Sequence, residues 1–127
     1  MAMRLLIERQ PDDFCLVRAV GEIDFATVVD LDSTLRRVQA DGHTHVLLDL
    51  WEVTFIDSVG IGVLLSAKRR AEKGTGGFAT FAEPQGVVQT AFHHAGLDYV
   101  MPVYSSRDFA TSMLRSYPSG VYANGNR

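Results

Sequence analysis

The stretch that decides the fold is Val53-Thr54-Phe55-Ile56-Asp57-Ser58-Val59-Gly60-Ile61-Gly62-Val63-Leu64-Leu65. It opens with β-branched and aromatic residues, which favour a strand, and then apolar residues recur at helical spacing at Ile61, Leu64 and Leu65. A strand that passes through a short loop into a helix is typical of α/β domains. We therefore predict a helix over residues 58–73, with basic residues in its last turns and Gly74 at its end.

Two strands and a helix are predicted before this stretch. Residues 4–8 and 14–20 are rich in strand-forming types and flank the turn-forming cluster Pro11-Asp12-Asp13, which favours an antiparallel pair. Asp24 is a good helix N-cap, and Asp41-Gly42 ends the helical pattern that follows it. The apolar residues of that pattern are Val28, Leu31, Leu35 and Val38.

Further strands and helices alternate along the rest of the chain. The strands are expected at residues 46–50, which read as an interior strand with both faces covered, and at 78–82 and 101–104. The helices are expected around the stripe Val88, Ala91, Phe92 and Ala95, which Gly96 ends, and over 107–115. The order predicts one α/β domain over residues 1–116, with a mixed sheet of about four to five strands and about four helices. Its opening hairpin should be antiparallel and its interior parallel, while residues 117–127 should form a flexible tail.

The amino-acid composition indicates which classes of binding partner are not expected. The chain has 127 residues, a formal net charge of -3 and a pI of about 5.7, so it offers no long-range attraction to nucleic acid or to an anionic membrane. Cys15 is the only cysteine, which excludes an intrachain disulfide and a multi-cysteine zinc site. The start lacks a signal-peptide core, and no apolar run reaches the roughly 18 residues of a membrane helix, so we expect a cytoplasmic protein without cofactor or metal.

The loop before the 58–73 helix is the expected functional region. Asp57 or Ser58 can cap the helix, and the free N–H groups of its first turn form a positive end that tolerates an anion. A serine placed there can carry a phosphate. Gly60 and Gly62 each cost about 1 kcal/mol relative to alanine inside a helix, which suggests that a partner must approach the backbone closely.

These residues carry a family resemblance over most of the chain. The sequence resembles a STAS domain and, more narrowly, the anti-sigma factor antagonists. The matching segments are Gly21-Glu22-Ile23-Asp24, Val46-Leu47-Leu48-Asp49-Leu50, the stretch from Phe55 to Leu65, and Ala95-Gly96-Leu97. The family's Asp-Ser-Ser/Thr-Gly signature places the phosphorylated hydroxyl directly after the aspartate, which carries over to Ser58. Val59 replaces the second hydroxyl of the signature, so any modulation through that second hydroxyl is absent here.

The resemblance implies a partner-switching cycle. In the family, the unmodified domain binds an anti-sigma factor that is also a serine kinase and frees the sigma factor. That kinase then phosphorylates the domain with its own ATP and binding ends, and a serine phosphatase can reset the switch. We expect the following residues to form the partner-binding patch: Asp24, Asp57, Ser58, Val59, Gly60 and Ile61.

Other interpretations of the same residues stand beside this one. Ser58 alone could be no more than an N-cap. Asp49 could end its strand in a solvent-facing loop without an acid-base role. His43 with His45, and His93 with His94, lack the one-face spacing of metal ligands and are expected at the surface.

The last alternatives concern aromatic residues and function. We expect Trp51 and Phe55 in the core, because aromatics beside an interior strand are commonly buried. No P-loop or complete dinucleotide fingerprint is present. Besides the switch, two functions stay open: a fixed STAS subunit of a lipid-transport ATPase or stress-signalling assembly, and a hydrolase with Ser58 as nucleophile. The hydrolase would need a histidine base and a Gly-x-Ser-x-Gly turn, whose first glycine position holds Ile56.

Overall fold

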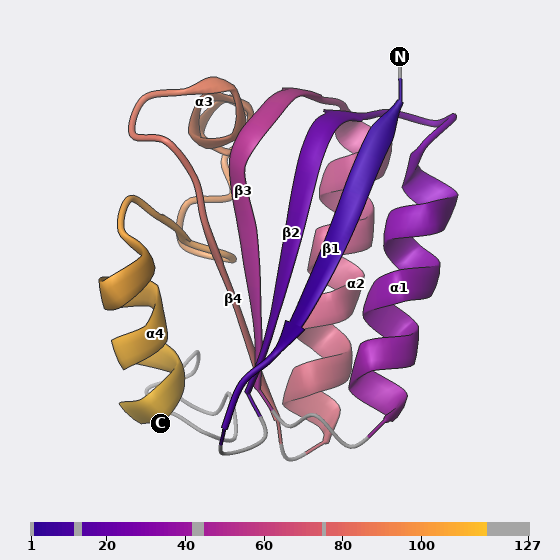
Figure 1. Ribbon diagram of the computed structural model, residues 1–127. Helices are drawn as coiled ribbons and strands as arrows, with labels where there is room; N and C mark the ends of the chain where they lie inside the picture. Colours follow the sequence, from indigo (N-terminus) through magenta and orange to yellow (C-terminus); the bar gives the residue numbers. More distant parts are fainter. Residues whose placement is uncertain (1, 12–13, 42–44, 75, 117–127) are drawn as a thin grey trace.

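The computed structural model describes residues 2–11, 14–41, 45–74 and 76–116 (Figure 1). The elements follow in the order β1 (Met3–Arg9), β2 (Phe14–Ile23), α1 (Val28–Ala40), β3 (His45–Ile56), α2 (Ser58–Lys73), β4 (Gly77–Phe81), α3 (Val87–His94), β5 (Val103–Tyr104) and α4 (Arg107–Ser116). The expected tail, residues 117–127, lies outside the described residues.

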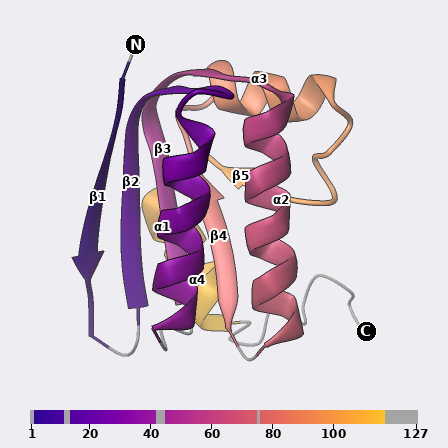
Figure 2. The same ribbon diagram turned by 90° about the vertical axis from the view of Figure 1, so that its right-hand side faces the viewer.

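The five strands form one mixed sheet in the order β1-β2-β3-β4-β5. β1 pairs antiparallel with β2, and every other neighbouring pair is parallel. Helices α1 and α2 cover one face of the sheet and α4 covers part of the other, while α3 lies at one end (Figures 1 and 2). The predicted fold class, with its antiparallel start and parallel interior, is confirmed.

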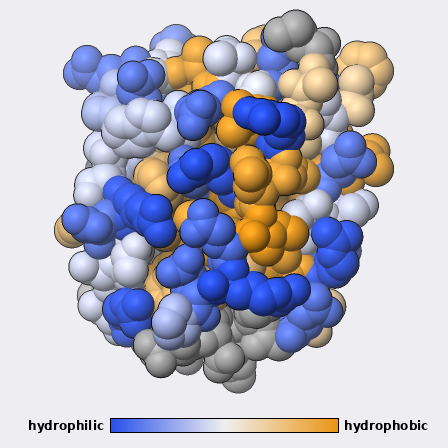
Figure 3. Space-filling view, in the orientation of Figure 1, coloured by the Kyte–Doolittle hydropathy of each residue, from blue (hydrophilic) through white to orange (hydrophobic). Residues whose placement is uncertain are grey.

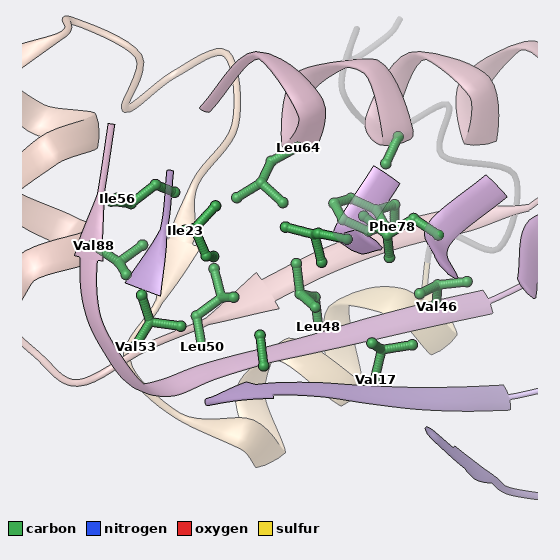
Figure 4. Packing of buried hydrophobic residues seen from close by; sticks show 14 of the residues in the cluster. Val17, Ile23, Val46, Leu48, Leu50, Val53, Ile56, Leu64, Phe78 and Val88 are labelled. Carbon is green, nitrogen blue, oxygen red and sulfur yellow. The ribbon is translucent and has the colours of Figure 1, made fainter. Parts of the chain in front are cut away.

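Strand periodicity divides the core between the two faces. In β2, Cys15 and Val17 point into the large cluster under α1 and α2, whereas Phe14 and Leu16 point into the smaller cluster under α4. Figure 4 shows the large cluster, where Leu48 of β3 and Leu64 of α2 meet side chains of the neighbouring strands. Burying a leucine contributes about 1.5–3 kcal/mol, so both clusters stabilise the central strands.

β3 is longer than the predicted strand at residues 46–50. It runs to Ile56, and Asp49 is therefore not the end of the strand. The Asp49 side chain is buried, its Oδ2 atom lies 3.0 Å from Arg18 Nε, and its Oδ1 atom accepts from Trp51 N at 2.9 Å. The predicted solvent-facing loop is wrong, because an ion pair and a backbone hydrogen bond satisfy the carboxylate inside the sheet.

Trp51 and Phe55 are exposed, at 41% and 46% of their surface, so their predicted core position is wrong. The pairing of β3 with β4 ends at Asp49 opposite Phe81, while the pairing with β2 continues to Ile56. Beyond Asp49, β3 has a neighbour on one side only, and part of its surface faces solvent. An aromatic residue in this extension is therefore partly uncovered.

The remaining expectations concern the thiol and the membrane. Cys15 is fully buried, as expected, and burial raises the pKa of its thiol, with Arg9 opposing that shift by its charge. No helix in the described ranges combines the length and apolar character that crossing a bilayer requires.

Candidate functional site

The candidate site lies at the carboxyl ends of β2 and β3. The register pairs Ile23 with Ile56 at the last position of both strands, and Asp57 N donates to Ile23 O at 3.2 Å. Asp24 and Asp57 therefore leave adjacent parallel strands at one edge of the sheet. The first turns of α1 and α2 begin at the same edge (Figure 1). We call this end of the molecule the Ser58 edge; it comprises residues 24–29 and 55–62.

Asp57, rather than Ser58, caps α2. Its backbone is extended, with φ -109° and ψ -176°, and its Oδ1 atom accepts from Gly60 N at 3.1 Å. Ser58 is the first residue of the helix and is exposed. Its hydroxyl makes no hydrogen bond within the described part of the chain. The interpretation of Ser58 as an N-cap is wrong, since its side chain has no capping role.

Asp24 shapes its own loop and does not cap α1. Its Oδ1 atom accepts from Ala26 N at 2.9 Å and from Thr27 N at 3.1 Å, which closes a turn ahead of the helix. Thr27 is the N-cap position, and its hydroxyl donates to Glu22 O at 2.7 Å. The predicted helix start at Asp24 is therefore wrong, because the aspartate satisfies this turn and α1 begins only at Val28. The carboxylate is half-buried and remains at the Ser58 edge.

Gly60 and Ile61 point into the protein. Both are buried, and a Cβ atom on Gly60 would lie 2.6 Å from Ile23 Cγ2 and 2.9 Å from Ile56 Cγ1. The glycine is needed because the first turn of α2 packs directly on the ends of β2 and β3. The predicted contact of Gly60 and Ile61 with a partner stays a prediction, and this burial leaves the two residues little surface for it. The close approach inferred for the Gly60 backbone is made by Ile23 and Ile56 of the sheet itself.

Gly62 differs from Gly60 in its exposure and in the space around it. It is exposed, and a Cβ atom built on it would meet nothing within 4 Å. Nothing in the described structure therefore requires a glycine at this position.

Three exposed apolar side chains at the Ser58 edge were not predicted as site residues. Phe25 is 78% exposed, Val29 is 64% exposed and Phe55 is 46% exposed, while the predicted site residue Val59 is 47% exposed. Val29 could have been found from the sequence, since it lies one position off the buried stripe that begins at Val28. Phe25 has no periodic signal, because it sits in the turn before α1.

The alternative chemistries gain no support from the described residues. The Ser58 hydroxyl has no histidine hydrogen-bonded to it there, as a nucleophile would need. His93 and His94 are exposed on α3, and His93 Nδ1 lies 2.9 Å from Asp98 Oδ2. Among the described residues, no group of three His, Cys, Asp or Glu side chains could hold a metal ion. His43 lies outside the described residues.

The fold and the Ser58 edge define a small α/β domain that presents an uncommitted serine at a helix entrance. A family model described as the STAS domain matches residues 6–110. The chain belongs to the STAS domain family.

Relatives of known type fall in one group. The chain is 30% identical over 95 residues to the anti-sigma-F factor antagonist RsfB of Mycobacterium tuberculosis (strain CDC 1551 / Oshkosh), which covers 75% of this chain and 76% of that protein. It is 34% identical over 64 residues to the anti-sigma-B factor antagonist of Staphylococcus aureus (strain NCTC 8325 / PS 47). That match covers 50% of this chain and spans 59% of the relative's length.

A solved structure supports the same grouping. The crystal structure of an anti-sigma factor antagonist from Mycobacterium paratuberculosis is similar with a TM-score of 0.78 at 30% identity, covering 89% of this chain and 94% of that one. The resemblance to STAS domains of the anti-sigma factor antagonist type is confirmed.

Proposed function

We propose that this chain is an anti-sigma factor antagonist in the cytoplasm, controlled by phosphorylation of Ser58. The unphosphorylated form binds an anti-sigma factor that is also a serine kinase, and a sigma factor is released. Phosphorylation of Ser58 by that kinase ends the binding, and a serine phosphatase restores it. One observation carries the proposal: the Ser58 hydroxyl is exposed and uncommitted at the start of α2, while Asp57 does the capping.

The partner surface is the exposed part of the Ser58 edge. Ser58 and Val59 lie on the outer side of the first turn of α2, next in sequence to the exposed Phe55. Phe25 and Val29 extend the apolar surface from the start of α1. Exposed apolar residues around a polar centre fit a protein interface, whose core is apolar and whose anchors are commonly aromatic. Asp24 and Asp57 supply the negative charge at its centre.

Phosphate would change binding much more than it changes folding. It adds about -1.5 to -2 charges, and the dipole of α2 stabilises this charge by only about 0.3–1 kcal/mol. Repulsion by the neighbouring Asp57 carboxylate opposes this stabilisation. An interface that closes over the neutral hydroxyl would have to bury this dianion beside that carboxylate, which costs several kcal/mol. Each 1.4 kcal/mol is tenfold in affinity, so the complex dissociates while the domain stays folded.

Phosphorylation is tested with the purified chain, candidate anti-sigma factor kinases and ATP, followed by peptide mass spectrometry. The matched control is Ser106, another exposed serine at a helix start, whose Oγ atom accepts from Phe109 N at 3.2 Å. We expect phosphate on Ser58, its loss in Ser58→Ala, and no change in Ser106→Ala. Phosphate elsewhere, or none with any kinase, would favour the fixed STAS subunit of a larger assembly.

A binding experiment distinguishes a phosphorylation switch from a phosphorylation that leaves partner binding unchanged. Ser58→Ala should remain bound to the kinase in the presence of ATP, whereas Ser58→Asp should bind weakly. Both variants should melt near the wild-type temperature, because the side chain does not cap the helix. Equal binding by the two variants contradicts the proposed switch.

A further inference from the structure

We propose that the outer edge of β1 pairs antiparallel with the same edge of a second copy of this chain, with Leu6 opposite Leu6 at the two-fold axis. The pairing joins the two sheets into one. It concerns a surface away from the Ser58 edge and does not depend on the proposed function.

β1 is a long edge strand. It has seven residues and pairs only with β2, whereas β5 at the opposite edge has two. In Figure 2, β1 stands at the rim of the sheet and α1 lies over the neighbouring strands, so the outer side of β1 is open. An edge strand presents a row of unpaired N–H and C=O groups, which is a template for another strand.

Several of the usual protections of an edge strand are missing from β1, although it carries the charged residues Arg4, Glu8 and Arg9. Its sequence, MRLLIER, contains neither proline nor lysine, and its pairing with β2 from Met3 to Arg9 shows no bulge. Leu6 and Ile7 are 47% and 38% exposed. A straight edge with apolar side chains at its middle is suited to pairing with another strand.

When two copies of β1 pair, their charged side chains are complementary in one register. An antiparallel pair centred on Leu6 sets Arg4 of each copy opposite Glu8 of the other, and Leu5 opposite Ile7. A pair centred on Leu5 or on Ile7 instead sets Arg4 and Glu8 opposite leucine, alanine or glutamine. A parallel pair would bring Arg4 near Arg4. The Leu6-centred antiparallel register is thus favoured, and its two-fold symmetry is the commonest in homodimers.

The faces of β1 fit this arrangement. Leu6 lies opposite Arg18 of β2, and Arg4 lies opposite Val20, so Arg4, Leu6 and Glu8 share the face of the sheet that α4 leaves partly open. Figure 3, which looks at the molecule from the β1 edge, shows hydrophobic surface gathered near the middle of this view. Pairing would cover Leu6 and place these apolar areas of the two copies side by side.

The Ser58 edges stay open in this dimer. β1 starts at the end of the sheet where β2 finishes, since Met3 lies opposite Gly21. A two-fold axis through Leu6 turns the second copy end over end, and the two Ser58 edges then lie at opposite ends of the joined sheet.

The experiment is sedimentation equilibrium of the full chain over a concentration series up to about 1 mM, which detects a dimer even at weak affinity. The wild type should dimerise. Arg4→Glu sets Glu opposite Glu8 twice, and Glu8→Arg sets Arg opposite Arg4 twice. Each substitution should raise the dissociation constant at least about tenfold, equivalent to about 1.4 kcal/mol. Circular dichroism should show both variants folded, because neither residue pairs with a charge on β2.

An equimolar mixture of the two variants is the decisive sample. One copy then carries two acidic and the other two basic residues at positions 4 and 8, and both cross-strand pairs are restored in the heterodimer. The mixture should dimerise at least as well as the wild type. Arg69→Glu, on the exposed side of α2, changes the net charge as Arg4→Glu does and should leave dimerisation unchanged. A monomeric wild type, a dimer that both variants retain, or a monomeric mixture overturns the proposal.

Discussion

Gly60 and Gly62 differ in burial, and comparing their substitutions gives the sharpest test of how α2 packs on the sheet. The two glycines lie two positions apart in the same helix, yet one is buried against the sheet and the other is open. Alanine has a helix propensity better by about 0.8–1.0 kcal/mol than glycine in a helix interior. Propensity alone therefore predicts that both Gly→Ala substitutions stabilise the protein.

At Gly60, but not at Gly62, packing makes the Gly→Ala substitution destabilising instead of stabilising. Its new methyl group would lie 2.6 Å from Ile23 Cγ2 and 2.9 Å from Ile56 Cγ1, and both isoleucines are held in the core. Overpacking of this kind costs about 1–3 kcal/mol, of which the better helix propensity of alanine offsets about 1 kcal/mol, so the net effect of Gly60→Ala is a loss of up to about 2 kcal/mol. Gly62→Ala, with nothing within 4 Å, should gain up to about 1 kcal/mol.

Urea unfolding followed by circular dichroism measures both effects. With an m-value of about 2 kcal/mol/M, Gly60→Ala should lower the urea midpoint by up to about 1 M and Gly62→Ala should raise it by up to about 0.5 M. The reasoning is refuted if Gly60→Ala is as stable as Gly62→Ala. That result would mean that α2 can shift away from the strand ends at little cost.

Three further expectations concern other polar groups. Asp57→Ala should cost about 0.5–2 kcal/mol in urea unfolding, because it removes the cap on Gly60 N, and an equally stable variant would contradict the capping role. Asp49→Ala should cost about 1–3 kcal/mol, since it leaves Trp51 N unpaired and Arg18 without its carboxylate; thermal melting at neutral pH measures this. Burial raises the pKa of the Cys15 thiol, so its contribution to stability is complete below the ordinary thiol pKa of about 8.5 and is lost as the pH rises above it. Cys15→Ala should remove that alkaline loss in a series of urea titrations, and an unchanged slope would contradict it.

The sequence was sufficient to predict the fold because its patterns are local. The 58–73 helix matches α2 at both ends, and the stripe from Val28 to Val38 is the buried side of α1. Residues 46–50 are buried on both faces, as an apolar run predicts. The length of β3 could not be predicted, because its extension beyond Asp49 depends on pairing with β2, a contact between distant parts of the chain.

The expected partner patch stays a prediction, but the structure divides its residues into exposed and buried ones for a physical reason. The patch comprises Asp24 and the continuous run from Asp57 to Ile61, of which residues 58–61 are helical. A helix turns about 100° per residue, so a helix packed on a sheet cannot expose four consecutive side chains equally. Ser58, Val59 and Gly62 are exposed, while Gly60 and Ile61 are buried. Helical periodicity applied to the motif itself would have separated the two sets.

The same periodicity explains how the first turn of α2 can pack tightly on the sheet and still expose a serine. Gly60 and Ile61 fix the inner side of α2 on the last residues of β2 and β3, and Asp57 fixes its first turn through Gly60 N. The side chains of Ser58 and Val59 neither pack inward nor close the helix, and of these two residues Ser58 carries the hydroxyl. A group added to its hydroxyl therefore meets solvent or a bound partner before it meets the core. A change at Ser58 can thus alter what docks at this edge while the fold beneath it is unchanged.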